Sequence, residues 1–167
     1  FYADSPYLRN NYRFSTYNAF GEDVIGSFKL YLSSINGLQG EDVRLSKRTR
    51  IPRNRIRGFK AGKIGPKDGT DYVGGNYAAA VNFETSLPNL LPENSKTDVG
   101  LFLDLGNIWG VDYSSSVDES SKIRSSVGVA ASWLSPIGPL SFILAQDIAK
   151  ADSDQTQSFT FNLGTSF

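Results

Sequence analysis

Apolar and polar residues alternate along most of the chain with a period of two. The C-terminal segment shows this most clearly, because Phe159, Phe161 and Phe167 fall on one face and Thr160 and Gly164 on the other. A β-strand points successive side chains to opposite sides of its sheet, so this alternation predicts strands with one apolar face. We therefore expect an all-β, antiparallel protein with seven strands, near residues 12–20, 24–34, 73–86, 98–110, 122–135, 139–149 and 158–167.

The two faces of the predicted strands differ in character. One carries large apolar residues, and the other is rich in Gly, Ala, Ser and Asn. A transmembrane β-barrel has this pattern, with apolar residues toward lipid and small polar residues toward its lumen, but a soluble β-sandwich also shows it. The predicted connections alternate between short and long, as periplasmic turns and outer loops do, which favours the barrel. We expect its lipid-facing residues to include Leu101, Leu103, Val127, Val129, Phe159 and Phe161.

The composition removes several classes of function. The chain has no histidine and no cysteine, so it lacks the commonest general base and the commonest metal ligands. We expect no enzyme activity, no cofactor and no metal site. No apolar run reaches the ~18 residues that a transmembrane helix needs. Methionine is absent even at position 1, so we expect a processed form or a part of a longer protein.

Positive charge is concentrated in one segment, although Lys+Arg and Asp+Glu balance at 17 each over the whole chain. Residues 44–67, here called the basic loop, hold ten Lys and Arg and no acidic residue, within a connection of about 36–72 that has no strand pattern. Loops of this length are usually functional or disordered. Three interpretations are open: nucleic-acid binding, a solvated charged loop, or a loop folded back into a barrel lumen. Phe59 is the only stacking aromatic in the segment, so we expect no nucleic-acid partner.

Two carboxylates make the lumen interpretation specific. By alternation, Glu84 and Asp104 occupy mid-strand positions on the small, polar face. A carboxylate on such a face needs a cation or hydrogen-bond donors. If the basic loop returns into the lumen, its arginines are the cations that these acids would meet.

The basic loop also carries a recognisable motif. Its residues Ile56, Arg57, Gly58 and Phe59, followed by Ile64-Gly65-Pro66, resemble the (V/I)RGF loop signature of the BamA family of outer-membrane protein assembly barrels, the bacterial surface antigen family. Further motifs that resemble this family follow in order: Gly74-Gly75-Asn76, Phe102–Trp109, Trp133–Leu140 and the C-terminal strand Phe161–Phe167.

This resemblance implies a fold and a site. The family barrel has sixteen strands, of which residues 1–167 would supply about the last seven, with a lumen-directed loop at about 36–72. Arg57 would brace the barrel wall through Glu84 and Asp104. The last strand, with Phe159, Phe161, Gly164 and Phe167, would meet the first strand of the barrel at a seam.

The resemblance also implies a function, which is the insertion of nascent β-barrel proteins into the bacterial outer membrane without any cofactor. The implied partners are nascent outer-membrane proteins, the other subunits of the assembly machinery and the lipid bilayer. Two alternatives stay open: a related family barrel for protein translocation or secretion, and a soluble binding β-domain with a basic loop.

Overall fold

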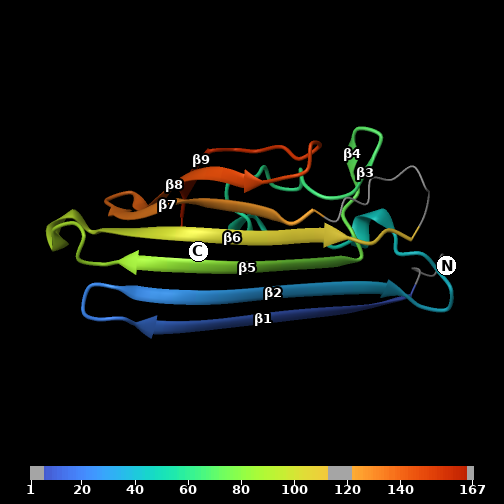
Figure 1. Cartoon of the computed structure of the whole chain (residues 1–167), viewed down its shortest axis with the longest axis horizontal. Coiled ribbons are helices and arrows are strands. Elements are labelled where there is room, and N and C mark those ends of the chain that lie inside the picture. The colour runs from blue at the N-terminus through green and yellow to red at the C-terminus, as the bar shows by residue number, and fades with distance from the viewer. Residues whose placement is uncertain (1–5, 113–121, 165–167) are drawn as a thin grey trace.

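A seven-stranded antiparallel sheet forms the body of the protein, in a computed structural model that describes residues 6–112 and 122–164. Neighbouring strands in the sheet follow the order β1-β2-β5-β6-β7-β8-β9 (Figure 1). Their bounds are β1 Tyr7–Ala19, β2 Ile25–Gly37, β5 Tyr77–Leu87, β6 Thr97–Trp109, β7 Arg124–Ser135, β8 Gly138–Ala149 and β9 Phe159–Leu163. The predicted all-β, antiparallel class is confirmed.

Most strand bounds agree with the sequence-based expectation, and two strand starts do not. β1 begins at Tyr7 rather than near residue 12, because Tyr7 and Leu8 pair with Gly37 and Asn36 at the end of β2. The polar run Arg9–Asn11 hides the alternation there. β5 begins at Tyr77 rather than near residue 73.

The late start of β5 has a backbone cause. Gly75 pairs with Thr49 of the basic loop, and so the chain before Tyr77 belongs to the loop and not to the sheet. At the other end of the chain, β9 covers Phe159–Leu163. The remainder of the strand predicted at 158–167, with Phe167, lies outside the described residues.

Five short elements escaped the pattern analysis because they are too short to show a period. β3 (Lys67–Asp68) and β4 (Asp71–Tyr72) form a small hairpin, and three turns of 3₁₀ helix are η1 (Leu45–Lys47), η2 (Arg53–Arg55) and η3 (Glu93–Ser95). Within residues 6–112 and 122–164, no helix has the length and apolar character required to cross a membrane.

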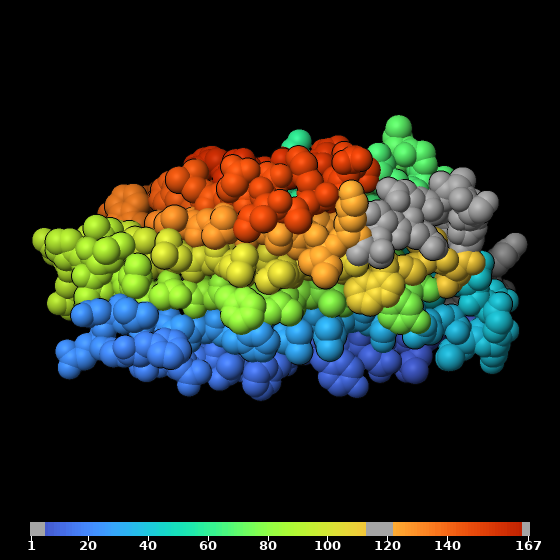
Figure 2. Space-filling model, in the orientation of Figure 1, coloured from blue at the N-terminus to red at the C-terminus, as the bar shows by residue number. Residues whose placement is uncertain are grey.

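The outer face of the sheet is an apolar surface that no other described segment of the chain covers. The six residues predicted to face lipid are all between 37% and 53% exposed, which places the large apolar side chains outward: Leu101, Leu103, Val127, Val129, Phe159 and Phe161. Figure 2 shows the strands side by side from blue to red, with most of the basic loop hidden behind them. Such a surface suits hydrocarbon and would be unfavourable in water.

The inner face is covered by the connection between β2 and β5, residues 38–76. The connections β1–β2, β5–β6 and β7–β8 lie at one end of the sheet, and this long one starts at the other end (Figure 1). Apolar residues of the loop pack on small and aromatic residues of the sheet to form one buried cluster of Ile51, Ile56, Phe59 and Ile64 with Tyr31, Ala78, Ala80 and Ile108. Each large side chain buried in this way contributes about 1.5–3 kcal/mol, so packing as well as charge holds the loop down.

The outer-face assignment predicts the effect of a charge placed there. For Val127→Arg in the intact barrel in lipid vesicles, we expect a loss of about 2–4 kcal/mol of unfolding free energy if the position lies near the bilayer midplane. The measurement is urea unfolding followed by tryptophan fluorescence.

Ser132→Arg is the matched control, because Ser132 lies on the same strand but lines a hollow of the inner face together with Glu84 and Asp98. We expect its cost to stay within about 0.5 kcal/mol. Equal costs for the two substitutions would show that the faces are wrongly assigned.

Candidate functional site

The basic loop touches the sheet through a glycine. Gly58 has a φ of +88°, which side-chain-bearing residues rarely adopt, and a Cβ there would lie 3.1 Å from the Cβ of Ala145 and 3.2 Å from that of Ser126. Glycine therefore lets the loop backbone lie directly against β7 and β8. The buried Ser126 hydroxyl donates a hydrogen bond to the carbonyl oxygen of Arg57 at this point.

The Arg57 guanidinium lies between two carboxylates of neighbouring strands. Its Nε donates to Oδ2 of Asp104 and its Nη2 to Oδ1 of the same residue, both at 2.9 Å. Its Nη1 donates to Oε2 of Glu84 at 3.0 Å. The backbone N–H of Arg57 also donates to Asp104, at 2.9 Å. The structure thus brings together the three residues that the sequence singled out, and the planar guanidinium serves both acids in a way that an ammonium group could not.

Asp104 is the buried centre of this network. Its side chain is fully buried, and Asn82 adds a further hydrogen bond from Nδ2 to Oδ1 at 2.8 Å. The same amide group donates to the carbonyl oxygen of Arg55, at 3.0 Å, which ties it to the loop backbone as well. A buried carboxylate is stable only when its oxygens receive several such donors, and Asp104 receives four.

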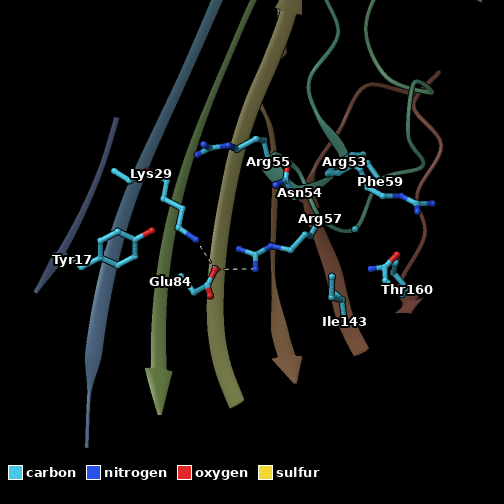
Figure 3. Close-up of a pocket in the computed structure, with 13 residues that line it drawn as sticks. Tyr17, Lys29, Arg53, Asn54, Arg55, Arg57, Phe59, Glu84, Ile143 and Thr160 are labelled. Carbon is cyan, nitrogen blue, oxygen red and sulfur yellow. Dashed lines mark hydrogen bonds and ion pairs between the residues drawn. The ribbon is translucent and has the colours of Figure 1, made fainter. Parts of the chain in front are cut away.

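Glu84 is held more loosely. Its side chain is 22% exposed, and Lys29 of β2 approaches the same oxygen at 3.9 Å. Figure 3 shows Glu84 between Lys29 and Arg57, beside a cavity of about 220 Å³ that Tyr17 and Thr160 also line. The two acids are therefore unequal partners of Arg57, one desolvated and one facing a cavity.

An aromatic ring completes the environment of Arg57. The guanidinium carbon lies 3.7 Å from the ring centre of Phe102, a buried residue of β6. The ring has room because Gly128 lies opposite it on β7, where a Cβ would come within 2.6 Å of the ring. In the sequence, Phe102 stood out only as the first residue of the motif Phe102–Trp109, and it was given no role of its own.

The charge state of Arg57 follows from this environment. Burial by itself opposes the charged form and lowers its pKa. The hydrogen bonds and charges of Asp104 and then Glu84 outweigh burial, so the pKa of Arg57 is raised above its ordinary value. Arg57 therefore stays a cation at every physiological pH.

A second buried ion pair was missed by the sequence analysis. Arg124, at the start of β7, donates from Nε to Oδ2 of Asp154 at 2.8 Å and from Nη2 to Oδ1 at 3.1 Å. Both side chains are fully buried. The available signal was an arginine on the polar face of a strand, together with an acidic connection between β8 and β9.

Among residues 6–112 and 122–164, strand β9 is the last of the sheet and its outer edge is open. Ala145 donates its backbone N–H to Ser158, and Gly164 donates to Pro139, both at 2.8 Å, which fixes the alternation of the β8–β9 ladder. Even-numbered residues of β9 therefore bond to β8. The N–H and C=O groups of the odd-numbered residues point to the open edge, and these are Phe159, Phe161 and Leu163.

These features can hold a loop against the sheet and offer a strand edge. Both acids of the first network are engaged by Arg57. Among the described residues, no group of three or more acidic, histidine or cysteine side chains is arranged to hold a metal ion.

A sheet with an apolar lipid-facing surface and a long loop folded onto its polar inner face defines the class of outer-membrane β-barrels. The comparison with protein families gives the family: the Omp85 superfamily domain matches residues 1–167, and so the chain belongs to the Omp85 superfamily. Members of this superfamily are outer-membrane proteins, which places this chain in the outer membrane.

Two curated relatives and one solved structure carry the same name. The chain is 28% identical over 99% of its length to "Outer membrane protein assembly factor BamA" of Neorickettsia risticii. It is 31% identical over 67% of its length to the protein of that name from Neisseria meningitidis serogroup B. The crystal structure of BamA from Haemophilus ducreyi lacking POTRA domains 1–3 matches 95% of the chain with a TM-score of 0.83 and 25% identity.

The chain is much shorter than these proteins. It spans 23% and 17% of the lengths of the two curated relatives and 35% of the solved chain. The seven-stranded sheet therefore corresponds to a part of the matched barrel structure.

The unequal burial of the two acids predicts unequal substitutions. In the intact barrel, Asp104→Asn should cost about 3–5 kcal/mol of unfolding free energy, because it leaves the Arg57 charge buried without its main partner. Glu84→Gln should cost about 0–1 kcal/mol, because this carboxylate is partly exposed. Urea unfolding in lipid vesicles measures both.

Each substitution replaces one carboxylate with its amide, so the pair is internally matched. Similar costs at the two positions would contradict the assignment of Asp104 as the main anchor of the basic loop.

Proposed function

We propose that this chain is the C-terminal part of an outer-membrane barrel that inserts newly made β-barrel proteins into the outer membrane. The observation that carries the proposal is an alignment that covers 99% of the chain, at 28% identity, with a protein named as an outer membrane protein assembly factor. The match to a solved BamA barrel supports it. The same names favour assembly over the alternative of a secretion or translocation barrel.

The open edge of β9 offers the chemistry that insertion needs. Backbone N–H and C=O groups cost several kcal/mol each when they are left unpaired in hydrocarbon. The edge groups of Phe159, Phe161 and Leu163 therefore require a partner strand inside the membrane. In the complete barrel the first strand supplies it, and during insertion the terminal strand of a client protein replaces that strand by adding to the sheet edge.

The reaction in this proposal is non-enzymatic and uses no nucleotide, metal or cofactor. Its free energy comes from the client's own strand pairing and from the burial of its apolar face in lipid. The role of the barrel is to present an edge in the correct register within the bilayer. The partners are the nascent client, the bilayer and the other subunits of the assembly machinery.

The basic loop has a mechanical role in this proposal, and nucleic acid is not a partner. Arg57 braces β5 and β6 from the inner side, so that the sheet keeps its shape while its edge exchanges partners. Phe59 is the only aromatic residue of the basic loop, and it is buried, so it is not available to stack on the bases of single-stranded nucleic acid.

A proline at the open edge tests the role of β9. Phe161→Pro removes an N–H that points to the open edge and leaves the hydrogen bonds to β8 intact. We expect it to slow the insertion of an unfolded outer-membrane protein by roughly fivefold, corresponding to about 1 kcal/mol for one lost hydrogen bond. The assay uses the intact protein in liposomes and follows the folding of the client by gel mobility.

Phe161→Ala is the control, because it removes the same ring and keeps the N–H. It should insert clients at close to the wild-type rate. Unchanged or faster insertion by Phe161→Pro would contradict the proposal, because the edge would then serve only to close the barrel.

A further inference from the structure

The chain between β8 and β9 does not form a simple turn. β9 pairs only with Leu140–Leu144, and the last residues of β8 have no partner on β9. Residues 153–157, here called the latch, run along the basic loop instead. Lys60 donates its N–H to Gln155 at 2.9 Å, Gln155 donates to Lys63 at 3.0 Å, and Gln157 donates to Gly58 at 2.9 Å.

A buried carboxylate fastens the latch at its start. Asp154 accepts two hydrogen bonds from Arg124 of β7, one from the backbone N–H of Ala151 at 2.7 Å and one from the N–H of Gly65 at 3.4 Å. Gly65 belongs to the basic loop. One side chain thus joins β7, the latch and the loop at a point that solvent does not reach.

The Arg124 side chain is also held by partners other than Asp154. Its Nη1 donates to Oδ1 of Asn107 on β6, at 2.6 Å, and to the carbonyl oxygen of Lys122 at 3.0 Å. An ion pair that is fully buried is strongly destabilised when one partner is removed, because the other charge is stranded. The Arg124–Asp154 pair therefore disfavours a partly opened latch. It favours either the closed latch, with the pair intact, or a fully opened latch in which the Asp154 carboxylate is in water.

Tyr72 adds a third contact. Its hydroxyl donates a hydrogen bond to the carbonyl oxygen of Ser153, at the first residue of the latch. Burial, and next the negative charge of Asp154, raise the pKa of Tyr72, so the hydroxyl keeps its proton at physiological pH. This contact lies in the β3–β4 hairpin, outside the membrane-spanning strands.

We propose that Arg124 and Asp154 are positioning residues that hold the latch on the basic loop and thereby set where β9 begins. A role of the latch in opening the seam between β9 and the first strand of the barrel rests on the proposed function. The closure of the latch on the basic loop is a property of the fold alone. With the latch closed, β9 can pair with β8 only from Ser158 onward. With the latch open, about nine residues between β8 and β9 become free to follow β9 away from β8.

The physical reason to expect such a device is the weakness of β9. In the part of the chain that the structure describes, the strand has five residues and one paired neighbour, and its large side chains point outward rather than into a protein core. Its own ladder is therefore a poor anchor against peeling. The buried pair and the latch backbone supply the anchor at the end where β9 enters the sheet.

Hydrogen exchange read by mass spectrometry tests the latch in the intact protein in lipid nanodiscs. Asp154→Asn should speed exchange in residues 153–163 by about tenfold or more and leave β5 and β6 unchanged. The control is Asp147→Asn, which makes the same change in the partly exposed pair of Asp147, in β8, with Lys150, just after that strand. It should leave exchange in the latch at the wild-type rate.

The pattern of the change separates positioning from general stability. A uniform rise over β5 to β9, or no rise in residues 153–163, would overturn the proposal. If Asp154→Asn does not fold, Tyr72→Phe decides, because it removes one neutral hydrogen bond and no charge. It should speed exchange in the latch by about fivefold, and no change there would equally overturn the proposal.

The readout does not depend on client insertion. If exchange responds as expected while insertion by the intact protein is absent, the latch stands and the proposed function fails. If the intact protein inserts clients while exchange in the latch does not respond, the proposed function stands and the latch proposal fails.

Discussion

The inner side of this sheet depends on one buried ion pair, formed by Arg57 of the basic loop and Asp104 of β6. A fully buried carboxylate is unfavourable unless each oxygen receives donors, and this one receives them from the side chain and backbone of Arg57 and from Asn82. The pair cannot form unless the loop backbone lies on the sheet. It therefore converts a long, strongly basic connection into a fixed element of the barrel wall.

Small residues around the Arg57–Asp104 pair leave the space that the contact needs. Gly58 lets the loop turn against β7 and β8, and Gly128 leaves space for the Phe102 ring beneath the guanidinium. Alanines on β5 accept the isoleucines of the loop. The second buried pair, Arg124 with Asp154, fastens the β8–β9 connection to the same loop. Two buried arginine–aspartate pairs thus join the basic loop to the strands of the sheet and to the connection that leads into β9.

The strands and the two acids of the first ion-pair network could be predicted from the sequence because both depend on a local period of two. Alternation placed Glu84 and Asp104 on one face, and the loop motif supplied Arg57. It did not reach the start of β1, where polar residues mask the period, or the short β3–β4 hairpin. It also missed Asp154, because a residue in a connection has no face until the chain is folded. Long-range contacts of loops are set by packing, which no local pattern records.

A double-mutant cycle between Arg57 and Asp104 tests the central claim most directly. The unfolding free energies of Arg57→Ala, Asp104→Ala, the double variant and the wild type are compared in the intact barrel in lipid vesicles. A buried, fully hydrogen-bonded pair predicts a coupling energy of about 2–3 kcal/mol, near the top of the range for residues in contact. A coupling energy below about 0.5 kcal/mol would show that the two residues act independently, and would contradict the account of how the loop is held.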